Sequence, residues 1–275
     1  MSKNSLWTVV YASVIGNLHV REGMPCQDAC AIKDLAEGWG IAVVADGAGS
    51  CQHSDKGAQQ TVYLAIQHFA NTVYKNQWIE KNNLPAQSQW DRLALENLMR
   101  IRDDLQTFSK QNQLPFESLS CTIIVLIYSP VGLLITHIGD GRAGYLNAQE
   151  EWQSMITPFR GEEANQTLFI TSDFEKEVES RVINEKISAF CVLSDGCEKS
   201  AFECNLFDKE KNLYYDPNRP YPKFFNPNIL ALSKLDNMNQ EQKNLLWQQF
   251  LIEGNAQLKN ETDDKTLILG MIAKV

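Results

Sequence analysis

The sequence predicts an α+β protein, in which helices and strands occupy separate stretches of the chain. Two long amphipathic helices follow each other in the first half, and apolar runs of strand length lie before them and, in greater number, after residue 120. Segregated runs of strands and helices favour an α+β architecture. The 275 residues, 44% of them hydrophobic, are enough for one large domain or two small ones.

The first strands are predicted ahead of the helices. Residues 7–13 alternate between apolar and polar, which is typical of a half-buried strand, and residues 29–33 form a second short strand. Residues 38–45 are apolar enough for a buried strand. The segment 16–28 between these runs is predicted to be irregular.

The strand over 38–45 stops abruptly at Asp46, which is followed by the small residues Gly47, Ala48 and Gly49. A buried strand that ends in this way delivers one carboxylate to the edge of its sheet. The glycines carry no side chain that would keep a ligand away from the backbone. An ordinary Asp-Gly turn between two strands is the alternative for this stretch taken alone.

Two helices come next. Ser54 and Asp55 are candidate N-caps, and the apolar residues after them keep helical spacing to about Lys75. A polar loop over residues 76–88 leads to a second helix, which ends before Pro115.

The rest of the chain is predicted mainly as strands. Their ranges are 120–128 and 131–138, joined as a hairpin at Ser129-Pro130, then 142–146, a strand-like 168–170, 187–193 and 266–272. Between them lie a mixed polar segment over 157–184, an irregular excursion over 201–228 that holds four prolines, and a helix over 241–253.

Composition excludes several classes of protein. The net charge of −9 argues against a general binder of nucleic acids or anionic membranes, because both require a basic face. The sequence shows neither the layout of a signal peptide nor an apolar run of membrane-spanning length. Its seven scattered cysteines lack paired zinc-site spacing and indicate reduced thiols in a cytoplasmic protein.

Four carboxylates share one position relative to the predicted strands. Asp46, Asp140, Asp195 and Asp263 each lie where an apolar strand meets a loop, and Asp28 lies beside another short strand. Unpaired buried charges are costly, and converging carboxylates repel one another, so a divalent cation is the usual way to hold them together. A site made of oxygens alone favours Mg²⁺ or Mn²⁺. A set of unrelated turn aspartates is the alternative.

Short motifs around these aspartates carry a family resemblance. They are Cys26-Gln27-Asp28-Ala29, Ala45-Asp46-Gly47-Ala48-Gly49-Ser50, Ile138-Gly139-Asp140-Gly141-Arg142-Ala143, Leu193-Ser194-Asp195-Gly196 and Asp263-Asp264-Lys265-Thr266. In this order they resemble the metal-dependent protein phosphatases, the PPM or type 2C serine/threonine phosphatases. The runs over 16–19, 23–28 and 161–167 further resemble the compact bacterial PphC-like subgroup.

The resemblance implies a four-layer αββα sandwich, with two central antiparallel sheets flanked by helices, as a single phosphatase domain over 1–275. It also implies a flap over about 157–184 beside the active site, with Phe159, Arg160 and Asn165 as substrate contacts. An ordinary connection is the alternative for this segment.

The resemblance further assigns a dinuclear Mn²⁺ or Mg²⁺ centre. Asp46 would bridge both ions, with the Gly47 carbonyl on one of them, and Asp195 and Asp263 would hold the other. Asp28 would act near the centre, directly or through water. Asp140, together with Asp195, matches the carboxylates that hold a third ion in bacterial members.

The chemistry implied by this centre is hydrolysis by water. Two metals about 3.5–4 Å apart lower the pKa of a bridging water, whose hydroxide attacks phosphorus while the ions neutralise the phosphoryl oxygens. No protein nucleophile is needed, and Asp46, Asp195 and Asp263 are the predicted catalytic residues of this kind.

The sequence departs from the family pattern at several positions. The phosphate-binding Arg of the family falls at Gly23, so His19 and Arg21 are the candidate substrate-binding residues, and His19 is also a candidate proton donor. Ala48 replaces a frequent His, and Gln27 replaces a frequent Glu. Asp264 stands where the family often has Asn, and its role is left open. Arg142 is either a substrate contact or a structural partner of a carboxylate.

The sequence therefore predicts a cytoplasmic phosphoprotein phosphatase that acts on phosphoserine and phosphothreonine. Its expected partners are a phosphorylated protein substrate and a serine/threonine kinase, with no nucleic acid, no membrane and a monomeric chain. Two alternatives stay open: a catalytically weak regulatory or binding module with the same fold, and a metal-dependent phosphatase of a small phosphorylated molecule.

Overall fold

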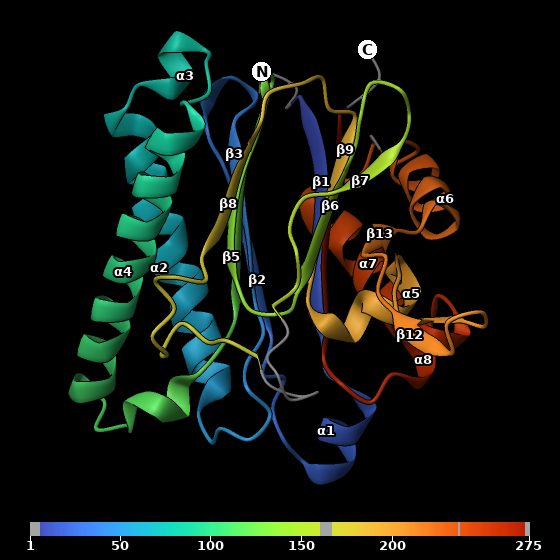
Figure 1. Ribbon diagram of the computed structural model, residues 1–275, viewed down its shortest axis with the longest axis horizontal. Coiled ribbons are helices and arrows are strands. Elements are labelled where there is room, and N and C mark those ends of the chain that lie inside the picture. Colours follow the sequence, from blue (N-terminus) through green and yellow to red (C-terminus); the bar gives the residue numbers. More distant parts are fainter. Residues whose placement is uncertain (1–5, 160–166, 236, 273–275) are drawn as a thin grey trace.

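Two antiparallel five-stranded sheets form the centre of the protein (Figure 1). The computed structural model describes residues 6–159, 167–235 and 237–272. The first sheet has the strand order β1 (Trp7–Val14), β14 (Lys265–Ile272), β9 (Ala189–Leu193), β6 (Arg142–Leu146) and β7 (Trp152–Ser154). The second has the order β2 (Ala29–Asp34), β3 (Gly40–Ala45), β4 (Ile123–Ser129), β5 (Gly132–Ile138) and β8 (Glu179–Ile183).

The sheets pack face to face, and helices cover both outer faces. The helices α2 (Ser54–Lys75) and α4 (Gln87–Gln111) lie on the second sheet, at the left of Figure 1. The first sheet is covered by α5 (Glu198–Ala201), α6 (Pro222–Leu232), α7 (Gln240–Glu253) and α8 (Ala256–Asn260). The predicted four-layer αββα sandwich is therefore confirmed.

Strand β3 shows why the central runs are apolar throughout. Ile41 and Val43 belong to the core beneath α2 and α4, whereas Ala42 and Val44 belong to the core between the sheets. Successive side chains point to opposite faces of a strand, and here both faces are buried. Continuous apolar runs are the expected sequence of such a strand.

The long elements match their predicted ranges closely, and the predicted hairpin between β4 and β5 pairs Ser129 with Gly132. The N-caps are an exception. Ser54 and Asp55 are the predicted N-cap candidates, but both lie inside α2, and its N-cap is His53, which makes no side-chain capping bond. The Ser54 hydroxyl instead donates to the Cys51 carbonyl at 3.1 Å.

Several short elements differ from the prediction. Residues 16–28, expected to be irregular, contain α1 (Asn17–Glu22), and the predicted loop 76–88 contains α3 (Trp78–Lys81). Residues 168–170 form no strand, although they were expected to. The excursion over 201–228 contains regular structure: β10 (Phe202–Glu203), β11 (Leu206–Asp208), β12 (Leu213–Tyr215), β13 (Arg219–Pro220) and the first part of α6.

Three short 3₁₀ helices complete the described secondary structure: η1 (Ala36–Gly38), η2 (Phe116–Leu119) and η3 (Asp195–Cys197). No helix in the described ranges is long and apolar enough to cross a membrane.

Candidate metal centre

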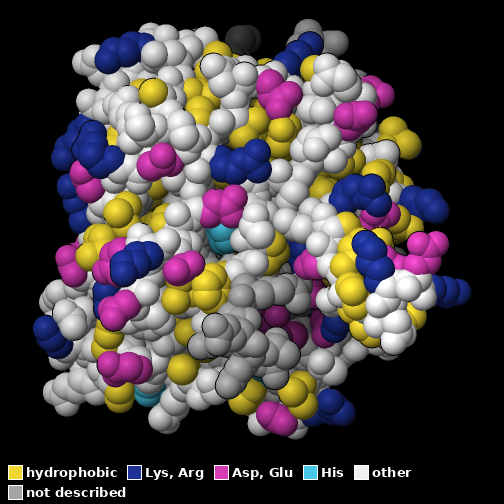
Figure 2. Space-filling view, in the orientation of Figure 1, with side chains coloured by type: hydrophobic (Ala, Val, Ile, Leu, Met, Phe, Trp, Pro, Cys, Tyr) yellow, Lys and Arg dark blue, Asp and Glu magenta, His cyan; other side chains and the backbone are white. Residues whose placement is uncertain are grey.

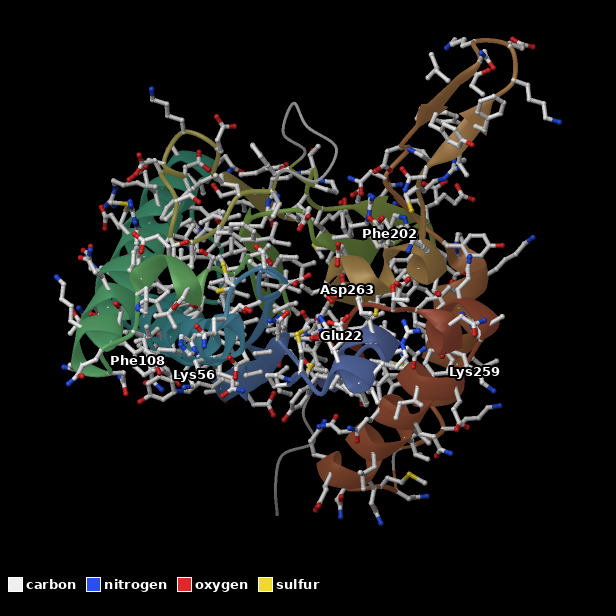
Figure 3. All side chains as sticks on the ribbon, turned by 90° about the horizontal axis from the view of Figure 1, so that it is seen from below. Glu22, Lys56, Phe108, Phe202, Lys259 and Asp263 are labelled. Atoms are coloured by element: carbon white, nitrogen blue, oxygen red, sulfur yellow. The ribbon has the colours of Figure 1, made fainter. Side chains whose placement is uncertain are left out.

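The predicted carboxylates come together at one end of the sandwich, beside α1. Pairing of β2 with β3 places Ala29 opposite Ala45, so Asp28 and Asp46 lie next to each other at the same end of the second sheet. In the first sheet, Leu193 of β9 faces Leu267 of β14, which brings Asp195 close to the loop before β14. Figure 3 shows Asp263 of that loop next to α1.

The backbone on both sides of Asp46 is fixed by residues 120–122. The Thr122 N–H donates to the Asp46 carbonyl at 2.8 Å, and the Asp46 N–H donates to Thr122 Oγ1 at 3.1 Å. Gly47 then forms a bridge with Cys121. A Cβ on Gly47 would lie 2.6 Å from the Gln27 carbonyl oxygen, so a glycine is required where these two segments meet.

Asp28 is held from the opposite sheet. The Ser194 hydroxyl donates to Asp28 Oδ2 at 2.7 Å, and the same hydroxyl oxygen accepts the Thr266 N–H at 3.0 Å. Ser194 is the neighbour of Asp195. One hydroxyl therefore joins the Asp28 carboxylate, at the end of the second sheet, to the strand ends of the first sheet.

The carboxylates affect one another's pKa. Burial raises the pKa of Asp195 to about 8, with further increases from Asp140 and Asp263. Burial also raises the pKa of Asp28 to about 7. The pKa of Asp46 is well above its ordinary value because of burial and then because of the surrounding aspartates. Each carboxylate therefore disfavours ionisation of the others. A bound cation would favour the ionised form of all of them and so lower their pKa values.

Asp264 has a different environment from its neighbour Asp263. It is buried, and its carboxylate accepts the Gly16 N–H at 2.7 Å and the Gln27 N–H at 2.6 Å. His19 Nδ1 lies 2.9 Å from the same carboxylate. Because this carboxylate also accepts two backbone N–H groups, we assign the ring hydrogen to Nδ1. Asp264 thus fastens α1 and the segment before Asp28 to the loop of Asp263.

The donor set fits a hard divalent cation. Among the described residues, no three Asp, Glu, His or Cys side chains already converge in a metal-ligand geometry. Asp195 Oδ1, however, is buried without a hydrogen-bond partner in the described part of the chain, and so is Gln27 Oε1. Buried oxygens of this kind are ordinarily satisfied, and Asp195 and Gln27 are close in sequence or space to the other predicted aspartates, so both oxygens are candidate partners of a cation.

The residues that are predicted to contact the substrate differ in their exposure and in their contacts. His19 is only 6% exposed, whereas Arg21 and Gly23 lie at the surface. The Phe159 N–H donates to the Gly139 carbonyl at 2.8 Å, next to Asp140. Arg160 and Asn165 lie outside the described residues.

Arg142 lies at the centre of a buried ion-pair network. It is fully buried, and its guanidinium donates to Glu198 at 2.8 and 3.0 Å and to Asp216 Oδ2 at 2.7 Å. It also donates to Asn218 Oδ1 at 2.7 Å. Of the two predicted roles, the structure favours that of a carboxylate partner.

Sequence reasoning did not predict the roles of three residues that organise this centre: Thr122, Ser194 and Asp264. Their partners lie 76, 166 and up to 248 positions away in the chain. The motifs beside these residues can be recognised in the sequence. No local pattern, however, indicates which distant group each residue binds.

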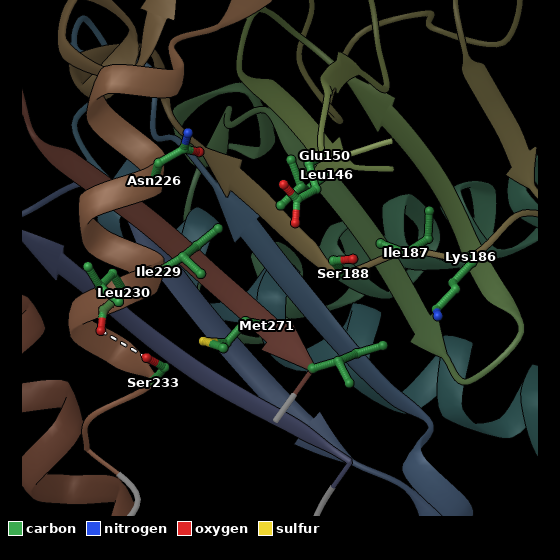
Figure 4. A pocket seen from close by; sticks show the side chains of 11 residues that line it. Leu146, Glu150, Lys186, Ile187, Ser188, Asn226, Ile229, Leu230, Ser233 and Met271 are labelled. Atoms are coloured by element: carbon green, nitrogen blue, oxygen red, sulfur yellow. Dashed lines mark hydrogen bonds between the residues drawn. The ribbon is translucent and has the colours of Figure 1, made fainter. Parts of the chain in front are cut away.

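Two other concave regions are not lined by a cluster of aspartates. A pocket of about 400 Å³ lies between α6 and the far ends of β9 and β14, lined by Ile229, Met271 and Ile187 among others (Figure 4). Its ionisable lining residues are Glu150 and Lys186. A separate open groove between β1, β2 and α7 reaches Asp28 and has a volume of about 690 Å³.

Comparisons with known proteins show which family and which fold the chain resembles. A family model described as Protein phosphatase 2C matches residues 15–246. Serine/threonine-protein phosphatase 3 of Escherichia coli strain K12 is 32% identical over 276 residues, which cover 98% of this chain and 99% of that protein. The family model ends before Asp263, whereas the match to the Escherichia coli protein spans nearly the whole chain.

Solved structures with the same fold include Staphylococcus aureus Stp1, a serine/threonine phosphatase. It matches with a TM-score of 0.59 at 14% identity and covers 100% of this chain and 98% of its own. RsbX, crystallised with magnesium, matches with a TM-score of 0.53 at 13% identity, with coverage of 99% and 98%.

Proposed function

The chain belongs to the protein phosphatase 2C family, and on this basis we propose that it hydrolyses phosphoserine and phosphothreonine in proteins through metal-activated water. The family is metal-dependent. The observation that carries the proposal is the cluster of strand-end aspartates, which raise one another's pKa at one end of the sandwich. Such a cluster is suited to divalent cations, and divalent cations are suited to phosphoryl chemistry.

We assign the ligands as follows. Asp46 would serve both of two Mn²⁺ or Mg²⁺ ions, the Gly47 carbonyl would bind one of them, and Asp195 and Asp263 would hold the other. Asp28 would act beside the pair, and Asp140 with Asp195 would hold a third ion. When bound, these ions supply an acidified water and neutralise negative charge on the phosphoryl group.

The protein's own residues position this chemistry. Thr122 holds the backbone of Asp46, and Ser194 holds the carboxylate of Asp28. Cys30 and Cys121 are disfavoured as nucleophiles, because burial raises the pKa of each thiol to about 12. A thiol in that state is a poor nucleophile at neutral pH.

His19 is our candidate for contact with the phosphate or for protonation of the leaving oxygen. Its imidazole is oriented by Asp264, in the way that a carboxylate orients a catalytic histidine. Burial raises the pKa of the Asp263 carboxyl, and His19 lies close enough to that carboxyl to oppose part of the increase. Arg21 is exposed on the same short helix and is the weaker candidate.

His19→Ala is therefore expected to lower kcat for a phosphoserine peptide by roughly 10²-fold, as for loss of a general acid. Hydrolysis of an aryl phosphate should change little, since its leaving group needs no proton. Steady-state kinetics on both substrates checks this, with Arg21→Ala as the matched control. Unchanged kinetics in His19→Ala together with a clear defect in Arg21→Ala would transfer the role to Arg21.

We further propose that the chain works as a monomer in the cytoplasm, opposite a serine/threonine kinase. None of its seven cysteines is disulfide-bonded, which is consistent with a reducing compartment.

The proposed function is tested by phosphate release. The protein should release phosphate from phosphoserine and phosphothreonine peptides with Mn²⁺ or Mg²⁺ and lose this activity with a chelator. Small phosphoesters should be poorer substrates. Faster turnover of a small phosphoester would indicate a small-molecule phosphatase, and absence of release from both would indicate a binding module. Full activity after chelation would exclude the metal mechanism.

A further inference from the structure

The strands β11 and β12 form a hairpin that extends away from the body of the protein, at the upper right of Figure 3. Leu206, Phe207, Leu213, Tyr214 and Tyr215 are exposed on it, and Tyr214 reaches 73%. Five of the fourteen large hydrophobic side chains exposed among the described residues thus lie in this ten-residue hairpin. Figure 2 shows hydrophobic side chains gathered on this projection.

The hairpin is fastened beside the candidate metal centre. Asp216, which directly follows β12, and Asn218, two residues later, accept hydrogen bonds from Arg142. Arg142 lies two residues after Asp140 and pairs with Leu193, two residues before Asp195. The base of the hairpin is therefore fixed to the same strand ends that supply the carboxylates.

The hairpin has features of a contact surface. Phe207 and Tyr214 pack with ring centroids 5.0 Å apart on one face, while Leu206 and Tyr215 are paired on the other. In the described sheets, β11 and β12 pair only with each other, so their outer edges are open to an added strand. Isolated two-stranded hairpins are marginally stable in water, and exposed apolar groups of this size commonly mark interaction sites.

We propose that this hairpin binds the polypeptide of the phosphoprotein substrate next to its phosphoresidue. This rests on the proposed function. The partner is an extended segment with apolar side chains, which would contact the hairpin while its phosphate reaches the aspartate cluster. The four charged residues of the hairpin, Asp208, Lys209, Glu210 and Lys211, sum to zero. The net charge of −9 on the whole protein repels a phosphate-bearing chain. The neutral hairpin does not add to this repulsion and can bind the substrate through apolar contacts.

The small size of the hairpin favours a transient substrate over a second copy of this chain. Stable interfaces use about 20–30 residues on each side, more than this hairpin offers. A substrate that must leave after each turnover requires no such area.

The test uses two phosphoserine peptides of equal length, one with Leu and Phe around the phosphoserine and one with Ser in their place, and an aryl phosphate. The wild-type protein should prefer the apolar peptide. The double variant Phe207→Ser/Tyr214→Ser should lose this preference, with kcat/KM for the apolar peptide falling roughly tenfold, mainly through KM. Turnover of the aryl phosphate should stay within about twofold, since the hairpin does not touch the metal centre.

A second pair, Leu206→Ser/Tyr215→Ser, tests the other face and should give the same result if the hairpin acts as a unit. The matched control is Tyr63→Ser/Tyr74→Ser, which removes two exposed aromatic rings from α2 and should leave peptide preference unchanged. Thermal melting establishes that every variant is folded.

Three results would overturn the proposal. The first is that both hairpin variants keep the wild-type preference for the apolar peptide. The second is that kcat/KM falls equally for the peptides and for the aryl phosphate. The third is that the wild-type protein sediments as a dimer and the hairpin variants sediment as monomers. If the wild-type protein hydrolysed none of the three substrates, the proposed function itself would fail. Aryl phosphate turnover without peptide preference would remove only the docking role.

Discussion

Replacing Asp46 by Asn is expected to lower phosphatase turnover by roughly 10³-fold or more, even with saturating Mn²⁺, while the protein stays folded. Burial raises the pKa of Asp46, and four other aspartates raise it further, which places Asp46 at the centre of the cluster: Asp28, Asp195, Asp140 and Asp263. A carboxylate shared by two ions contributes to every function of a two-metal site. Asparagine keeps the shape but loses the charge.

The same substitution should stabilise the metal-free protein at neutral pH. An acid whose pKa is higher in the folded state than in the unfolded state binds more protons when folded, so stability decreases as pH rises between the two values. Asp46, Asp28 and Asp195 all have raised pKa values. Removing Asp46 should therefore raise the melting temperature in chelator near pH 7 and flatten its decline between about pH 4 and 8.

The measurements are peptide kinetics in saturating Mn²⁺ and melting curves in chelator across that pH range. Asp103→Asn, at an exposed carboxylate on α4, is the matched control and should change neither. Near-normal turnover in Asp46→Asn would show that the bridging assignment is wrong.

The long elements could be predicted because their patterns are local. β3 and β4 are apolar on both faces, since each is covered by helices on one side and by the other sheet on the other. Helix α2 carries its buried residues at helical spacing over 22 residues. In these elements, the apolar pattern of the neighbouring residues is enough to predict whether a residue is buried.

Short elements depended on contacts that no local pattern records. Helix α1 has six residues, too few to be stable alone, and its Leu18 N–H donates to the Thr262 carbonyl at 3.0 Å. β8 pairs with β5 although Glu179 and Arg181 give it a polar sequence. The prolines of 201–228 suggested irregularity, yet Pro222 occupies the first turn of α6, where proline is well tolerated.

The site was predictable to a similar extent. Strand ends indicated where Asp28, Asp46 and Asp195 would lie, because antiparallel neighbours bring their ends together. The roles of Ser194 and Asp264 were not predictable, since each is defined by a partner on a distant segment. Asp264 is buried, whereas Asp263 is exposed. Two adjacent aspartates carry no sequence signal of that difference.

The second large effect is expected at Arg142, where Arg142→Met should lower the free energy of unfolding by about 3 kcal/mol. The guanidinium is fully buried and donates to Glu198, Asp216 and Asn218. Removing it leaves two acids near each other without their cation. The side chains of Glu198 and Asp216 are 14% and 21% exposed, so water partly replaces the lost bonds, which places the cost at the lower end of the usual range for a broken buried pair.

Arg142→Lys should recover only part of this loss, because an ammonium group cannot reproduce the planar fork that reaches three partners. Urea and thermal unfolding measure both variants, and a fall in melting temperature of roughly 6–12 °C is expected for Arg142→Met. Arg92→Met, which breaks an exposed pair with Glu96 on α4, is the matched control and should cost less than about 1 kcal/mol. If Arg142→Met cost no more than this control but raised KM for a phosphopeptide, Arg142 would be a substrate contact. A large loss of stability would instead identify it as the residue that fastens the base of the hairpin to the strand ends carrying Asp140 and Asp195.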